Sequence, residues 1–193
     1  MKKTPLNDIA EIALKKINSL KASPLLVAVD GRCAAGKTTL ADDLRQKLGC
    51  AVFRMDDFFL RPQQRTKERL LEAGGNIDHE RFKEEILKPI KADQREIVYH
   101  SFDCKSMALS EPLRAEAGRI TIIEGSYSCH PELWEYYDLH IFLSVDSDEQ
   151  IKRIITRNGE EKAKDFKEKW IPMEEKYFST FNIEEKCELK FHT

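Results

Sequence analysis

Glycine, lysine and threonine occur in this chain at a spacing that can hold phosphate groups. Residues 31–38 read G-R-C-A-A-G-K-T, the pattern G-x-x-x-x-G-K-[ST], and they follow the apolar run Leu25–Val29. The glycines let the backbone turn its N–H groups toward phosphate oxygens, Lys37 reaches the terminal phosphates, and Thr38 offers its hydroxyl to Mg²⁺. Without a ligand the segment would be only a glycine-rich turn, but a strand, a loop and a helix follow in the required order. We therefore predict that a nucleoside triphosphate is bound by Gly31, Arg32, Cys33, Ala34, Ala35, Gly36, Lys37, Thr38 and Thr39.

Acidic residues follow each of the three later apolar runs of the chain. They are Asp56 with Asp57, Glu124, and Asp146. In an open parallel sheet ligands bind outside the carboxyl ends of the strands, so we expect these side chains at the same edge as the phosphate-binding loop. Such a concentration of carboxylates suits Mg²⁺ binding and proton transfer.

The acidic residues receive separate predicted roles. We predict Asp56 as the catalytic base that takes a proton from an acceptor hydroxyl, with Asp57 as the alternative. Glu124 ends an apolar strand beside a glycine and is predicted to hold Mg²⁺ together with Thr38. Asp146 is the alternative for that role, but it precedes a helix and is expected mainly to form a turn. For all of these residues a solvated acid or a helix cap is the competing explanation.

Two arginines four residues apart predict a cationic lid. Arg153 and Arg157 lie on one face of a predicted helix, where they could neutralise the phosphoryl group during transfer or simply be solvated. Asp78 precedes another helix and is either its N-cap or a ligand of substrate hydroxyls. Trp134 and Trp170 are expected to be packing residues.

Apolar patterning supplies the elements that must position these residues. Four runs predict buried strands: Leu25–Val29, Ala51–Met55, Ile120–Ile123 and Leu139–Val145. Shorter strand candidates are Glu96–His100 and Cys187–His192. The alternation of strands with helices predicts an α/β fold, in three layers around a mainly parallel sheet.

Helix signals fall between these strands. Predicted helices span residues 6–20, 37–48, 79–87, 147–157, 162–169 and 173–181, the last two separated by a break at Pro172. Thr4 is the expected N-cap of the first helix, and Ser147 with Gln150 forms a predicted capping box at the fourth. Residues 62–75 and 103–118 are expected to be excursions from the sheet.

Composition limits the class of protein. The 193 residues suit one domain, residues 1–193, and 32 basic residues nearly balance 34 acidic ones, so nucleic-acid binding is not expected. The N-terminus has no signal-peptide pattern and no run long enough to span a membrane, which predicts a cytoplasmic protein. Five separated cysteines indicate ordinary reduced thiols, and Cys33 is singled out as the one whose pKa could be lowered by the adjacent helix N-terminus. Homo-oligomer formation is left open.

Residues 25–157 resemble the uridine kinase-like group of P-loop kinases. The resemblance rests on the loop and on four further segments: Met55-Asp56-Asp57-Phe58-Phe59, Asn76-Ile77-Asp78-His79, Ile122-Ile123-Glu124-Gly125, and Arg153 with Arg157. It implies strand order 2-3-1-4-5, a short helical lid, ATP with Mg²⁺ as the phosphoryl donor, Asp56 as base, and Asp78 as a ligand of sugar hydroxyls. A small-molecule acceptor with a hydroxyl group follows from the same resemblance.

The chain departs from that group at the acceptor side. Where uridine kinases carry an aromatic residue, a histidine and an arginine to hold the nucleoside, this chain has Phe102-Asp103-Cys104-Lys105-Ser106. Phe102 is the expected substrate contact there. The segment 170–175 has no counterpart that we can place in uridine kinases. A nucleoside-like acceptor is therefore favoured, while pantothenate, phosphoribulose or nicotinamide riboside kinases share the framework, and a nucleotide-binding protein without catalysis is a further alternative.

Overall fold

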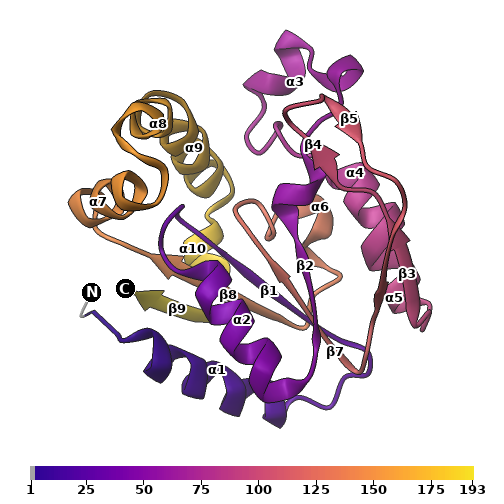
Figure 1. Ribbon diagram of the computed structural model, residues 1–193. Helices are drawn as coiled ribbons and strands as arrows, with labels where there is room; N and C mark the ends of the chain where they lie inside the picture. The colour runs from indigo at the N-terminus through magenta and orange to yellow at the C-terminus, as the bar shows by residue number, and fades with distance from the viewer. Residues whose placement is uncertain (1–2) are drawn as a thin grey trace.

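A five-stranded parallel sheet forms the centre of the molecule (Figure 1). The computed structural model describes residues 3–193. The strands of the sheet are β1 (Leu25–Gly31), β2 (Ala51–Arg54), β7 (Ile120–Glu124), β8 (Leu139–Ser144) and β9 (Leu189–His192). Their spatial order is β2-β7-β1-β8-β9, and every pairing is parallel. Counted along the chain within this sheet, the order is 2-3-1-4-5, which confirms the predicted α/β architecture.

Strand β1 lies in the middle of this sheet. Val27 pairs with Ile122 on one side and with Leu139 on the other, and all seven residues of β1 are buried. A strand covered on both faces needs a continuous apolar run, which is the pattern that the sequence shows at Leu25–Val29. Both candidate minor strands also form, as β3 (Glu96–Tyr99) and as β9.

Four short strands lie outside the main sheet. β3 pairs with β6 (Leu113–Glu116), and β4 (Phe102–Asp103) pairs with β5 (Ala108–Leu109), both antiparallel. The predicted excursion at residues 103–118 therefore contributes strands of its own.

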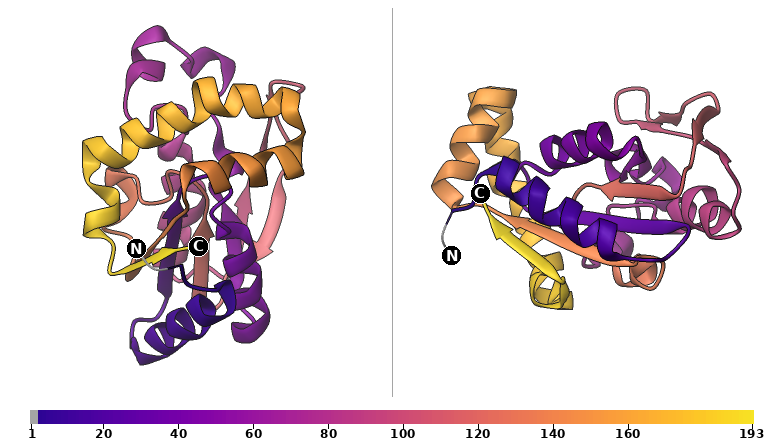
Figure 2. Two further views of the ribbon diagram at one scale, coloured as in Figure 1. Left: turned by 90° about the vertical axis from the view of Figure 1, so that its left-hand side faces the viewer. Right: turned by 90° about the horizontal axis from the view of Figure 1, so that it is seen from below.

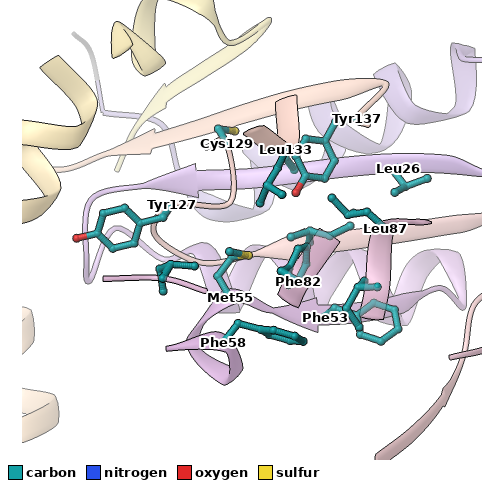
Figure 3. Packing of buried hydrophobic residues seen from close by; sticks show 14 of the residues in the cluster. Leu26, Phe53, Met55, Phe58, Phe82, Leu87, Tyr127, Cys129, Leu133 and Tyr137 are labelled. Carbon is teal, nitrogen blue, oxygen red and sulfur yellow. The ribbon is translucent and has the colours of Figure 1, made fainter. Parts of the chain in front are cut away.

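Helices cover both faces of the sheet. On one face α1 (Leu6–Ser19) and α2 (Lys37–Leu48) pack Ile9, Leu40 and Leu44 against β1. The other face carries α4 (His79–Phe82), a π-helical turn (Lys83–Leu87), α5 (Lys88–Lys91) and α6 (Pro131–Trp134). Figure 3 shows part of this second core, in which Leu26, Phe53, Met55, Phe82 and Leu133 come together. The two cores hold the carboxyl ends of the strands in fixed positions.

The segment after β2 is mostly short turns. It contains two 3₁₀ turns, Met55–Phe58 and Pro62–Gln64, and helix α3 (Lys67–Leu71). The predicted strand Ala51–Met55 thus ends one residue early, because Met55 begins the first of these turns.

A helical arm connects β8 to the last strand, β9, and crosses the molecule between them (Figure 2). It comprises α7 (Ser147–Asn158), α8 (Glu160–Asp165), a π-helical turn (Phe166–Trp170), α9 (Ile171–Phe181) and α10 (Ile183–Lys186). The predicted break at Pro172 is wrong, because Pro172 stands in the first turn of α9, directly after the π turn. Proline lacks a backbone N–H, and it is tolerated in the first turn of an α-helix because the N–H groups there have no partner within the helix. The other π turn, Lys83–Leu87, likewise precedes a proline, Pro89.

Two predicted helix caps are also wrong. Helix α1 begins at Leu6 with Pro5 as N-cap, while the N–H of Thr4 is donated to the carbonyl of His192 at 2.7 Å. Helix α7 has Asp146 as its N-cap, and the carboxylate of Asp146 forms ion pairs with His192 and Lys3. Local sequence patterns predicted these caps, and tertiary contacts between distant segments changed them.

Candidate active site

A cavity of about 590 Å³ lies at the carboxyl ends of β1, β2 and β7. Seven of the residues predicted to act at the site line it: Lys37, Thr38, Thr39, Asp56, Glu124, Arg153 and Arg157. Cys33, Ala34 and Gly36 of the phosphate-binding loop line it as well. The structure therefore brings together the loop, the two predicted magnesium ligands, the predicted base and the lid arginines.

The loop between β1 and α2 depends on glycine at two positions. Gly31 has φ +134°, and a Cβ atom there would lie 2.0 Å from the carbonyl oxygen of Leu143. Gly36 has φ +95° and is the N-cap of α2. Only glycine adopts such conformations without strain, and at Gly31 a side chain would also collide with the backbone of β8. The loop is thus held tightly against the sheet.

Lys37 is held inside the loop. Its side chain is buried, and Nζ donates to the carbonyl oxygens of Gly31 at 2.6 Å and Arg32 at 3.0 Å and to the hydroxyl of Ser126 at 3.2 Å. Its position at the start of α2 adds a positive charge to the helix N-terminus, an arrangement that favours anions.

Glu124 and Thr38 meet at the floor of the cavity. The carboxylate oxygens of Glu124 accept the Thr38 hydroxyl at 3.2 and 3.3 Å, and Arg54 lies 3.4 Å from the same carboxylate. Burial raises the pKa of Glu124, while the charge of Lys37 acts in the opposite direction. A hydroxyl and a carboxylate in direct contact, with Asp56 on the same cavity, are an oxygen donor set that fits Mg²⁺.

The two neighbouring aspartates differ in their surroundings. Asp56 is exposed and lines the cavity. Asp57 is half-buried and its Oδ1 accepts the hydroxyl of Ser101 at 3.2 Å, and burial raises the pKa of Asp57. Only Asp56 of this pair therefore lines the cavity.

Asp30 is an organising residue that the sequence analysis missed. It is fully buried, and its oxygens accept hydrogen bonds from the N–H groups of Gly31, Tyr127 and Cys129 and from the hydroxyl of Tyr177, at 2.7 to 3.1 Å. Burial raises the pKa of Asp30 to about 6, although these hydrogen bonds oppose the rise. The carboxylate joins the phosphate-binding loop, the segment after β7 and helix α9. A charged residue in an otherwise apolar strand was the available signal.

Cys33 is not an activated thiol. Burial, followed by the nearby charge of Glu174, raises the pKa of Cys33 to about 12. The expectation of a lowered pKa is therefore wrong, since the loss of solvation outweighs the adjacent helix N-terminus. The amide of Gln150 on α7 donates to the Cys33 carbonyl at 3.0 Å and to its sulfur at 3.2 Å. Gln150 thus bonds to the loop rather than forming the predicted capping box.

The helical arm supplies two further cations of the cavity beside Lys37. Nη1 of Arg153 donates to the carbonyl of Ala34 at 3.2 Å and to the hydroxyl of Thr193 at 3.0 Å. Arg157 lies over the ring of Phe166, 5.8 Å from its centroid. Both arginines thus come from α7, on the side of the arm that faces the loop.

Three further cavity residues come from the arm and from the segment after β7. Ser126 and Glu174 are buried polar residues, and Trp170 is half-buried. Trp170 was expected only to pack, whereas Trp134 does pack, with its ring stacked 3.8 Å from that of His140. Ser126 and Glu174 carry no motif that would have revealed them.

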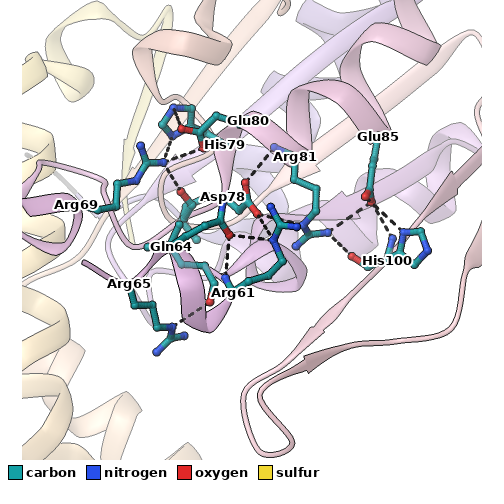
Figure 4. A network of polar contacts seen from close by, with 12 residues as sticks. Arg61, Gln64, Arg65, Arg69, Asp78, His79, Glu80, Arg81, Glu85 and His100 are labelled. Carbon is teal, nitrogen blue, oxygen red and sulfur yellow. Dashed lines mark hydrogen bonds and ion pairs between the residues drawn. The ribbon is translucent and has the colours of Figure 1, made fainter. Parts of the chain in front are cut away.

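Five predicted residues lie away from the cavity lining: Gly31, Arg32 and Ala35 of the loop, and the two acceptor-side residues Asp78 and Phe102. Asp78 is fully buried as N-cap of α4, accepts the N–H of Arg81 at 3.1 Å, and forms ion pairs with Arg81 and Arg61 at 3.3 and 3.4 Å (Figure 4). Phe102 is buried in β4, with Arg65 5.6 Å above its ring. The structure thus shows Asp78 in the helix-cap role, the alternative that the sequence analysis left open, and the cavity lining includes neither Asp78 nor Phe102.

A loop that presents backbone N–H groups, lysine and threonine after the first strand of a parallel sheet defines a P-loop nucleotide-binding protein. A family model described as "AAA domain" matches residues 27–176, and the chain belongs to this family. Among residues 3–193, none of the helices has the length and apolar character to cross a membrane.

Relatives and solved structures agree with the predicted resemblance. Uridine-cytidine kinase B of Dictyostelium discoideum is 28% identical over 151 residues, which cover 73% of this chain and 61% of that protein. Uridine kinase of Ureaplasma parvum is 26% identical over 75% of this chain and 73% of that protein. The chain spans only 32% of uridine kinase-like protein 3 of Arabidopsis thaliana, at 26% identity over 74% of this chain.

The fold is similar to those of two solved structures. A structure described as a possible uridine kinase from Bacillus stearothermophilus has a TM-score of 0.69 at 24% identity, covering 96% of this chain and 98% of that one. The D-glycerate 3-kinase of Cryptococcus neoformans has a TM-score of 0.65 at 16% identity, covering 97% and 94%. These likenesses establish the P-loop kinase fold, and the resemblance to uridine kinase-like proteins is confirmed.

Proposed function

We propose that the protein is an ATP-dependent kinase that transfers the γ-phosphoryl group to a hydroxyl of a small metabolite. The observation that carries the proposal is the position of Asp56 on the same cavity as the phosphate-binding loop, Thr38 and Glu124. A kinase needs a carboxylate within reach of the acceptor hydroxyl and an electrostatic cradle for the transferred phosphate. The curated relatives, which are named as uridine kinases, support the same reaction class.

Each group has a distinct task in this proposal. Lys37 and the loop N–H groups hold the phosphates, and Thr38 with Glu124 holds Mg²⁺, which neutralises charge on the phosphates when bound. Asp56 orients the acceptor hydroxyl and takes its proton. Arg153 and Arg157 close over the donor from α7 and exclude water from the transfer.

A nucleoside-like acceptor is favoured by the relatives, but one observation supports a second candidate class. Asp78, the residue that the family resemblance assigns to sugar hydroxyls, already serves as the N-cap of α4 and is paired with two arginines. Phe102 is covered by Arg65. A non-nucleoside alcohol, such as pantothenate, a sugar phosphate or a hydroxy acid, therefore belongs among the candidate acceptors.

The test is ADP release from ATP and Mg²⁺ with a panel of nucleosides, vitamins, hydroxy acids and sugar phosphates, followed by mass spectrometry of the product. We expect one acceptor class to raise turnover well above the rate with water alone. With that acceptor, Asp56→Asn should lower kcat by about 10²- to 10⁴-fold, the usual contribution of a general base. Asp57→Asn is the matched control and should retain most of the activity.

Two outcomes would contradict the proposal. ATP binding without a phosphorylated product for any acceptor would indicate a nucleotide-binding protein without catalysis. Full activity of Asp56→Asn, with loss in Asp57→Asn, would instead move the base to the neighbouring residue.

A further inference from the structure

Glu174 places a carboxylate against the phosphate-binding loop. It stands near the start of α9, is 5% exposed and lines the cavity. Its Oε2 accepts the backbone N–H of Cys33 at 3.0 Å, and its Oε1 accepts the hydroxyl of Ser126 at 2.6 Å. An N–H group of this loop is the kind of donor that a phosphate oxygen uses.

The same carboxylate is linked to the lysine of the loop. The hydroxyl of Ser126 accepts a hydrogen bond from Nζ of Lys37 at 3.2 Å and donates its own proton to Glu174. Glu174 therefore lies at the end of a short chain of hydrogen bonds that begins at the ammonium group. A phosphate that approaches Lys37 comes close to a negative charge with which it must share donors.

Glu174 is held in this position by its neighbour. Glu175 forms a two-point contact with Arg32, with distances of 2.6 Å to Nε and 3.2 Å to Nη2, and Glu184 adds a third bond to Arg32 at 3.2 Å. Two successive carboxylates of α9 thus hold two successive residues of the loop. The contact with Arg32 anchors the arm, and the contact with Cys33 brings a charge into the cavity.

We propose that Glu174 is an internal anion that competes with the terminal phosphates of a bound nucleotide for the loop, so that its charge sets the nucleotide affinity. The inference rests on the proposed nucleotide site. Phosphate binding would require the carboxylate to release the Cys33 N–H and the Ser126 hydroxyl. Because α9 is anchored through Glu175, the side chain of Glu174 can withdraw while the arm stays attached to Arg32.

A purely structural role makes a different prediction. Glutamine has nearly the same shape as glutamate, and its side-chain oxygen can still accept a hydrogen bond from Cys33 or Ser126. If Glu174 only ties the arm to the loop, Glu174→Gln leaves phosphate affinity unchanged or weakens it. If its charge competes with phosphate, the same substitution strengthens binding.

The experiment compares Glu174→Gln with Glu168→Gln by calorimetric titration of ATP, pyrophosphate and adenosine. Glu168 lies exposed on the π turn of the same arm, and within residues 3–193 it forms no ion pair, so its substitution removes an equal charge outside the site. We expect Glu174→Gln to lower the Kd for ATP and pyrophosphate by about tenfold, the scale of relieving one unfavourable charge contact. The Kd for adenosine, and all Kd values of Glu168→Gln, should stay at the wild-type value.

Unchanged or weaker ATP binding by a folded Glu174→Gln protein would overturn the inference, as would an equal gain for adenosine. If that variant does not fold, Glu174→Ala takes its place, because it removes the same charge and should also strengthen ATP binding. Again, an unchanged Kd would contradict the inference. Failure of the wild-type protein to bind ATP or pyrophosphate would instead contradict the proposed function.

Discussion

Asp30 is completely buried and accepts four hydrogen bonds. Its raised pKa makes the free energy of unfolding depend on pH. Its pKa of about 6 in the folded protein lies above the ordinary value of 3.8. The folded protein therefore binds a proton at Asp30 more tightly than the unfolded chain does. The contribution of Asp30 to stability is complete below about pH 4 and is lost as the pH rises through 6.

We predict that the difference in unfolding free energy between the wild type and Asp30→Asn falls by roughly 3 kcal/mol between pH 4 and pH 7, since each pKa unit corresponds to about 1.4 kcal/mol. Urea denaturation of both proteins across this range measures it. The comparison cancels the titration of other groups. A difference that stays constant with pH would show that Asp30 does not titrate in this window.

Individual site residues could be predicted only where a local pattern marked them. Lys37 and Thr38 belong to a motif, and Glu124 ends an apolar run, so their approach to one cavity followed from the strand-end rule. Ser126 and Glu174 are ordinary polar residues in the sequence. They meet the loop because chain segments about ninety and one hundred and forty residues away fold back onto it.

Two side chains of helix α7, Gln150 and Arg153, join it to the phosphate-binding loop, and Gln150 is the buried one. Gln150 is 3% exposed and donates to the carbonyl and the sulfur of Cys33. Replacing it with an apolar residue leaves a buried carbonyl oxygen without its partner, a change that costs about 1 to 3 kcal/mol.

We accordingly predict that Gln150→Leu lowers the unfolding free energy by about 2 kcal/mol and loosens the contact of α7 with the loop. Chemical denaturation measures the loss, and faster amide hydrogen exchange at residues 33–36 reports the loosening. Thr156→Ala, on an exposed position of the same helix, serves as the control and should change stability by less than about 0.5 kcal/mol. Equal stability of Gln150→Leu and the wild type would contradict this role.

For the helices and strands, the sequence predicted the central residues more accurately than the residues at which each element begins and ends. The apolar runs and the 3.6-residue periods located all five strands of the sheet and the main helices. The ends depended on contacts that no local pattern encodes: Gln150 bonds to Cys33 instead of a helix cap, and Pro172 is accommodated after a π turn. Strand order came from the family resemblance, because periodicity does not specify which strands are neighbours.

The cavity joins two parts of the molecule, the edge of the sheet and the helical arm, so a ligand there contacts both. We predict that ATP with Mg²⁺ at about one hundred times its Kd stabilises the protein by about 2.7 kcal/mol. For a chain of this length that corresponds to a rise in Tm of roughly 5 to 10 °C. Differential scanning fluorimetry measures the shift, and Lys37→Ala should show little of it at the same ATP concentration. An equal shift in both proteins would place ATP elsewhere.

The central position of β1 also bears on how the chain is made. β1 ends at Gly31, but its two partners, β7 and β8, begin only at Ile120 and Leu139. During translation the most apolar strand emerges first, and α1 and α2 can cover only one of its faces. One hydrogen-bonding edge of β1 then remains open until β7 is complete at Glu124, and the other until β8 is complete at Ser144, about three quarters of the way along the chain. Chains interrupted before residue 144 would therefore carry a hydrophobic strand with at least one unpaired edge, and we expect them to aggregate or to require a chaperone.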